Sequence, residues 1–91
     1  MIGIRLLGLA AGGKSPYDGQ WLVEYDPTRQ GVHPTRGHRT LAHLVCTSDP
    51  GRARRFGSAA EAHAVWTAPS GRPYPLDRPL TAFHIKVEEL P

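Results

Sequence analysis

The side chains best suited to chemistry are three histidines and the only cysteine, all in the middle third of the chain: His33, His38, His43 and Cys46. These residue types bind zinc, which usually requires a closely spaced pair of ligands. Here successive candidates lie five, five and three positions apart. Two of them fall in an expected loop, and two fall on an expected strand where they point to opposite faces. We therefore expect neither a metal site nor any other cofactor.

His43 and Cys46 also suggest a catalytic base and its nucleophile. Residues three apart on a strand point to opposite faces of the sheet, which keeps an imidazole away from a thiol. The apolar surroundings of Cys46 raise the pKa of a thiol instead of activating it. We therefore predict that Cys46 has a structural and not a catalytic role.

Gly8 to Ser15 reads G-L-A-A-G-G-K-S, which matches the spacing of a phosphate-binding loop. Such a loop needs a helix directly after it, because the helix N-terminus supplies N–H groups to the phosphates. The residues that follow are Pro16-Tyr17-Asp18-Gly19 and then an expected strand. Together with the cysteine, this context predicts a protein that is not an enzyme.

The strongest candidates for binding are arginines. Six bases and a single acid, Asp49, lie between Arg29 and Arg55 in a chain of net charge +3. We expect Pro50–Arg55 to form a short helical turn whose arginines capture carboxylate or phosphate in bidentate fashion. The predicted binding residues are Arg52, Arg54 and Arg55, helped by Arg36 and Arg39, with Tyr74 as an exposed recognition residue. The alternative is a solvated basic turn whose arginines pair with Asp49 or Glu61.

One helix must hold that turn in place. Ser58 and Glu61 form a capping box, in which the Ser58 hydroxyl accepts from the N–H of Glu61 and the carboxylate returns to the N–H of Ser58. The helix should run from Ala59 to about Thr67. Its apolar residues recur at helical spacing, and Trp66 is expected to supply most of the buried area.

Four strands are predicted around this helix: Ile2–Leu9, Gln20–Tyr25, Leu41–Thr47 and Thr81–Leu90. Alternation predicts that Trp21, Val23 and Tyr25 share one face, and the nearly continuous apolar run before Thr47 predicts a central strand. The expected fold class is α+β, a small antiparallel sheet of about four strands with one packed helix in the order β-β-β-α-β. Asp26–Thr40 and the proline-rich Ala68–Leu80 are expected to be loops.

The length of 91 residues predicts a single small α+β domain spanning residues 1–91. A lone cysteine fits a reducing cytoplasm. No apolar run approaches the roughly 20 residues that span a bilayer. The early Arg5 also lies inside the first apolar stretch, whereas a secretory signal carries its charge ahead of that stretch. We expect a cytoplasmic protein without membrane contact.

Three segments resemble small proteins of phages, prophages and GC-rich bacteria: Asp49–Trp66 (D-P-G-R-A-R-R-F-G-S-A-A-E-A-H-A-V-W), Arg78–Glu88 (R-P-L-T-A-F-H-I-K-V-E) and Trp21–Pro27 (W-L-V-E-Y-D-P). By type alone, a small charge-patterned protein of this kind is also similar to anti-CRISPR inhibitors of host defence. The resemblance implies a binding protein that occupies a surface of a host protein or nucleoprotein complex. The charge pattern offers an alternative, a nucleic-acid-binding accessory protein that uses the basic segment Arg29–Arg55.

Overall fold

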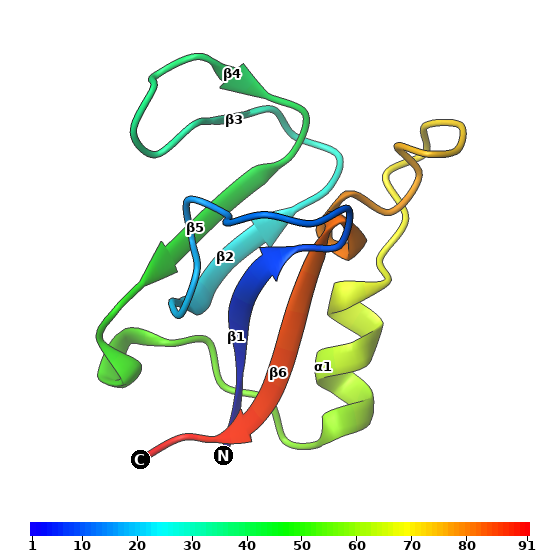
Figure 1. Ribbon diagram of the computed structural model, residues 1–91. Coiled ribbons are helices and arrows are strands. Elements are labelled where there is room, and N and C mark those ends of the chain that lie inside the picture. Colours follow the sequence, from blue (N-terminus) through cyan, green and yellow to red (C-terminus); the bar gives the residue numbers. More distant parts are fainter.

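The computed structural model describes all of residues 1–91 as an antiparallel sheet of four strands with one α-helix beside it (Figure 1). The sheet strands are β1 (Ile2–Leu9), β2 (Trp21–Asp26), β5 (His43–Thr47) and β6 (Phe83–Glu89), and the helix is α1 (Ala59–Trp66). The α+β class and the order β-β-β-α-β are confirmed. No helix is long or apolar enough to cross a bilayer.

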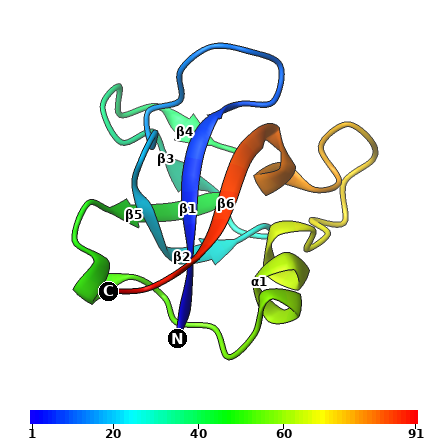
Figure 2. The same cartoon turned by 60° about the horizontal axis from the view of Figure 1, so that its bottom comes forward.

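The strand order in the sheet is β5-β2-β1-β6, so β1 and β2 are the central strands. The prediction of a central strand before Thr47 is therefore wrong, because β5 lies at an edge. Its Leu44 and Cys46 pack against the core, whereas Val45 between them is 36% exposed. The side chains of this apolar run therefore alternate between a buried face and a partly solvated face of the sheet. Figure 2 shows how strongly the sheet twists, since β5 runs across the direction of β1.

A β-bulge in β2 changes which side chains share a face. The pairing of β2 with β5 shifts between Leu22, which lies opposite Cys46, and Glu24, which lies opposite Val45. One extra residue reverses the alternation beyond it. Leu22 and Tyr25 therefore both pack against the core, and the prediction that Trp21 shares a face with Tyr25 is wrong.

Trp21 is buried on the opposite face of the sheet. It lies opposite Arg5 in the register of β1 and β2, and the Arg5 guanidinium sits 4.6 Å from its ring centroid. Gly3 leaves room for the indole, since a Cβ at that position would come within 2.9 Å of the Trp21 ring. A cation above the ring and a glycine beside it keep Trp21 only 3% exposed.

The helix α1 begins as predicted, with a change in the cap. Ser58 Oγ accepts from the N–H of Glu61 at 3.2 Å. The Glu61 carboxylate, however, accepts from the N–H of Gly57 at 2.9 Å, one residue before the expected donor. Ala62 is the only fully buried residue of the helix, and Trp66 is partly buried. Ala62 makes the close approach to the sheet, and the larger Trp66 packs beside it with part of its surface exposed.

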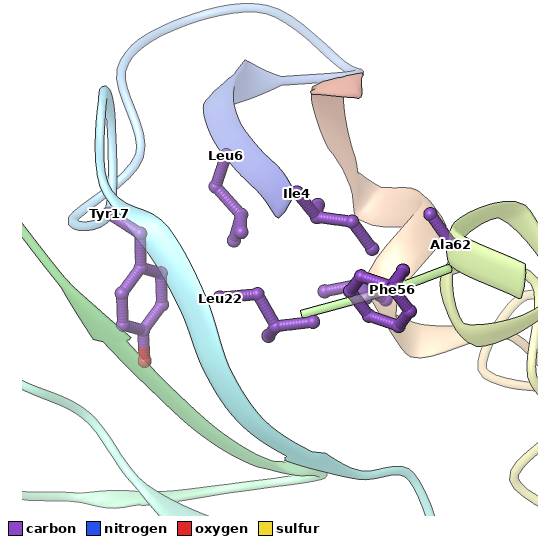
Figure 3. Close-up of a cluster of buried hydrophobic side chains, with 7 residues drawn as sticks. Ile4, Leu6, Tyr17, Leu22, Phe56 and Ala62 are labelled. Carbon is purple, nitrogen blue, oxygen red and sulfur yellow. The ribbon is translucent and has the colours of Figure 1, made fainter. Parts of the chain in front are cut away.

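The main hydrophobic cluster lies between the sheet and α1. Figure 3 shows Ile4 and Leu6 of β1, Leu22 of β2, and Phe56 and Ala62 from the chain around the helix pointing toward one another. Phe56 is 4% exposed, and its backbone forms both hydrogen bonds of a bridge to Ile2. This bridge holds the segment that carries the arginines against the end of β1.

The segment Asp26–Thr40, predicted as a loop, contains a small hairpin. Its strands β3 (Gly31–Val32) and β4 (Arg39–Thr40) pair with each other and not with the main sheet. The turn between them is rich in proline, glycine and basic residues, and its two strands are too short to produce a recognisable alternation of apolar residues. Figure 1 shows this hairpin at the far end of β5 from the chain termini.

The proline-rich segment Ala68–Leu80 is folded back on itself. Ser70 Oγ accepts from the N–H of Arg72 at 3.1 Å and donates to the carbonyl of Leu76 at 2.7 Å, and the N–H of Ser70 donates to the carbonyl of Asp77. The loop is also tied to β2, because the N–H of Leu80 donates to Tyr25 Oη at 3.0 Å. These bonds fix the position of a segment that has little regular secondary structure.

Candidate functional site

Cys46 and His43 lie on opposite faces of β5. Cys46 packs against the core, and burial raises the pKa of its thiol from 9.0 to about 12. His43 lies on the other face, where its Nε2 is 3.8 Å from a carboxylate oxygen of Glu24. The thiol therefore stays protonated at neutral pH and has no imidazole beside it.

His33 and His38 meet in the β3–β4 hairpin, with ring centroids 4.8 Å apart. Nδ1 of His33 accepts from the N–H of Arg36 at 3.0 Å and from the N–H of Thr35 at 3.2 Å. Partial desolvation, with His38 and Arg36 close by, lowers the pKa of His33. His33 therefore acts as a neutral acceptor that shapes the turn. No group of three or more histidine, cysteine, aspartate or glutamate side chains is placed to hold a metal ion.

The segment Gly8–Ser15 uses its polar groups internally. Ser15 Oγ donates to the carbonyl of Leu7 at 2.8 Å and accepts from the N–H of Tyr17 at 3.2 Å. Ser15 is 8% exposed, and a turn leads from it into β2. The hydroxyl that a phosphate loop offers to a metal ion is thus occupied, and no helix begins there to face a phosphate.

The three arginines near the helix do not form one face. The turn predicted over Pro50–Arg55 is a 3-10 helix that ends at Arg52. Ala53 is extended, and the N–H of Arg54 donates to the carbonyl of Leu22 at 2.8 Å. The helical turn that would place Arg52 and Arg55 on one face therefore stops at Arg52. The Arg54 guanidinium lies 5.1 Å from the ring centroid of Phe56.

None of the six bases between Arg29 and Arg55 forms an ion pair, and all six are exposed. The two carboxylates proposed to neutralise them are used as caps. Asp49 accepts from the N–H of Gly51 at 2.9 Å, and Glu61 accepts from Gly57. The arginines therefore remain available to a partner.

The six bases fall into separate places. Arg36 and Arg39 belong to the β3–β4 hairpin, whereas Arg52, Arg54 and Arg55 follow the other end of β5 (Figure 1). The two groups lie on either side of β5 in the sequence, and a strand of five residues is roughly 16 Å long. Arg54 and Arg29 meet at a small mixed-charge hollow of about 340 Å³ that also contains Glu24 and Asp26. The sequence segment is basic, but it does not form one continuous basic surface.

The largest concave feature is an apolar groove of about 660 Å³. Three segments form its walls: the connection between β1 and β2, the chain around the β3–β4 hairpin, and the proline-rich loop (Figure 1). Its base consists of side chains that also pack against the core: Tyr17, Tyr25, Leu44, Leu80 and Phe83. We refer to this feature as the apolar groove.

Large apolar side chains stand exposed along the apolar groove. Tyr74 is 87% exposed, Leu41 is 47% exposed and Leu76 is 39% exposed. Exposed apolar surface of this kind, next to polar residues, marks interaction sites in soluble proteins. Tyr74 was predicted as a recognition residue, and the structure places it at this groove.

Leu41 and Leu76 were not predicted. Leu41 was assigned to a strand, although it lies just before β5. Leu76 lies in R-P-Y-P-L-D-R-P-L, where two apolar side chains in a proline-rich loop were the only signal. The groove itself could not be found from sequence, because its walls come from three distant parts of the chain.

Comparison with family models, with curated proteins and with solved structures finds no match to this chain. The resemblance to small phage and prophage proteins stays a prediction.

Proposed function

We propose that this protein is a non-catalytic binding protein of the mobile-element type, and that it acts by covering a surface of a host protein or nucleoprotein complex. The apolar groove is the observation that carries this proposal. The resemblance of three segments to phage and prophage proteins supports the suggested origin, and by type it makes host-defence complexes candidate partners.

The groove has the features of a protein-binding surface. Its base is anchored in the core, so its shape is already present before a partner arrives. The proline-rich wall is held by Ser70 and by the bond from Leu80 to Tyr25. Binding to a preorganised surface loses less conformational entropy than binding to a mobile one.

The polar candidates for catalysis support a role in binding alone. The Cys46 thiol is buried and protonated, with the pKa raised to about 12, and His43 lies on the other face. Ser15 is occupied within its loop. None of these groups lines the apolar groove.

Loss of the groove's exposed side chains tests the proposal. Tagged wild-type protein and a Tyr74→Ser, Leu76→Ser variant would be used to capture proteins from a lysate of the host cells, with quantification of each captured protein. We expect the wild-type partners to be lost with the groove variant and kept by the control variant Arg52→Glu, Arg55→Glu. Both variants change exposed residues, so their folds should be stable to within about 0.5 kcal/mol.

A second candidate function, nucleic-acid binding, is supported by the six exposed arginines that lack ion pairs. If the control variant loses the partners while the groove variant keeps them, the basic residues carry the function. Such binding would also weaken steeply with salt, because phosphate contacts release counterions.

A further inference from the structure

The charges around the apolar groove indicate what kind of segment it takes. Among its twenty lining residues there is no aspartate or glutamate, and Arg78 is the only arginine. Two further exposed arginines, Arg36 and Arg39, belong to the hairpin that contributes His33 and Thr40 to the lining. The nearest carboxylate in the sequence, Asp77, lies in the proline-rich wall but does not line the groove.

We propose that the apolar groove binds an extended peptide segment of a partner protein, in which apolar side chains are flanked by aspartate or glutamate. This inference rests on the proposed function and names the chemistry of its partner. The apolar side chains would cover Leu41, Tyr74 and Leu76. The flanking carboxylates would reach Arg78, the only arginine of the lining.

The arrangement of charges matches the anatomy of protein interfaces. Their centres are apolar and their rims are polar, and complementary charges at the rim select the partner. Arginine is suited to this role, because its planar fork binds a carboxylate through two parallel hydrogen bonds. Neither Arg36, Arg39 nor Arg78 has an ion pair within the chain, so no internal contact must be broken.

A second copy of the chain fits the groove poorly. In a two-fold symmetric dimer the same surface patch of each copy faces the other. Arg78 of one copy would then face the same patch of the other, with no carboxylate lining the groove to compensate. Like charges brought together at an interface oppose association.

Selection from a library of short random peptides displayed on phage tests the proposal. The full chain would serve as bait, with counter-selection on the Tyr74→Ser, Leu41→Ser variant to keep only groove-dependent peptides. We expect the selected peptides to carry apolar residues with an excess of aspartate and glutamate beside them. Their affinity for an Arg78→Glu variant should fall by about tenfold or more, whereas Arg52→Glu, Arg55→Glu should leave it unchanged. Circular dichroism would verify that each variant is folded.

The outcomes separate the two proposals. Groove-dependent peptides with no acidic excess, or with unchanged affinity for the Arg78→Glu variant, would overturn the charge preference and leave the groove as the binding surface. A library without any groove-dependent peptide would overturn the peptide segment as the ligand, whereas lysate capture with the Tyr74→Ser, Leu76→Ser variant decides whether the groove is the binding surface. If a single-stranded oligonucleotide of thymidines displaces the selected peptides, the proposal of an acidic peptide segment is overturned. The ligand of the groove would then be nucleic acid.

Discussion

At the scale of single residues, Tyr25 links the sheet to one wall of the groove. The β-bulge turns its side chain toward the core, and its hydroxyl accepts from the N–H of Leu80, which is 1% exposed. Burial raises the pKa of Tyr25, although the bond to Leu80 opposes that rise. A single hydroxyl therefore holds the end of the proline-rich loop.

Replacing Tyr25 by phenylalanine should destabilise the protein by about 1–3 kcal/mol, because the buried N–H of Leu80 loses its only acceptor. Urea unfolding monitored by tryptophan fluorescence measures the loss. Tyr74→Phe is the matched control, since that ring is 87% exposed and its change should stay within about 0.5 kcal/mol. Equal unfolding midpoints for the two variants would contradict the role of Tyr25.

Cys46 should make the protein less stable in alkali. Because burial raises the pKa of its thiol from 9.0 to about 12, the unfolded chain loses this proton at a lower pH than the folded chain. The folded state is therefore favoured below pH 9, and this contribution is lost as the pH rises from 9 toward 12. Unfolding free energies over pH 8 to 11 should fall less steeply for Cys46→Ala than for wild type. Parallel curves would show that the thiol ionises equally in both states.

At the scale of elements, α1 is short and depends on its cap and on one close contact. Ser58 and Glu61 satisfy N–H groups at its start, and Ala62 approaches the sheet with no exposed surface. An isolated helix of this length is marginal in water. Its stability therefore comes from these two features.

Ser58→Ala should lower the free energy of unfolding by about 1 kcal/mol, since the N–H of Glu61 loses its acceptor. Thermal and urea melts measure the change. Ser48→Ala is the control, because Ser48 is exposed and caps no helix. If both serines prove equally dispensable, the cap contributes nothing to the fold.

Ala62→Leu should cost about 1–3 kcal/mol, because extra methylene groups would be forced between α1 and β1. The same substitution at exposed Ala60 introduces leucine into the helix without overpacking and should be nearly neutral. A leucine at residue 62 that is tolerated as well as one at residue 60 would mean that the helix packs loosely.

At the scale of the whole molecule, the basic residues act from two separate places. Arg36 and Arg39 lie in the hairpin at one end of β5, and Arg52 and Arg55 follow its other end (Figure 1). Changes at distant sites with no shared partner usually have additive effects. The arginines of the hairpin and those after β5 therefore form two small groups and not one large one.

Heparin affinity tests this separation. Arg36→Glu with Arg39→Glu, and Arg52→Glu with Arg55→Glu, should each lower the salt concentration of elution, and the fourfold variant should lower it by about their sum. Lys86→Glu, on β6, serves as a charge-reversal control away from both patches. An effect of the fourfold variant well beyond that sum would indicate one continuous basic surface.

Features governed by neighbours along the chain were predictable from sequence. The start of α1 depends on residues Ser58 and Glu61, and the alternation of β6 places Phe83, Ile85 and Val87 on the core side. The short local range of caps and the period of two in a strand make these patterns readable. The α+β class follows from them.

Only the tertiary structure decided the features that depend on partners distant in sequence. The edge position of β5 is set by which strands pair, and the direction of Tyr25 by a bulge against β5. The expected basic site divides between the β3–β4 hairpin and the chain after β5, and Tyr74 and Leu41 line one groove only because segments distant in sequence fold together. A pattern along the chain carries the preferences of single elements, whereas strand pairing and the shape of a groove arise from packing between elements, which no local pattern encodes.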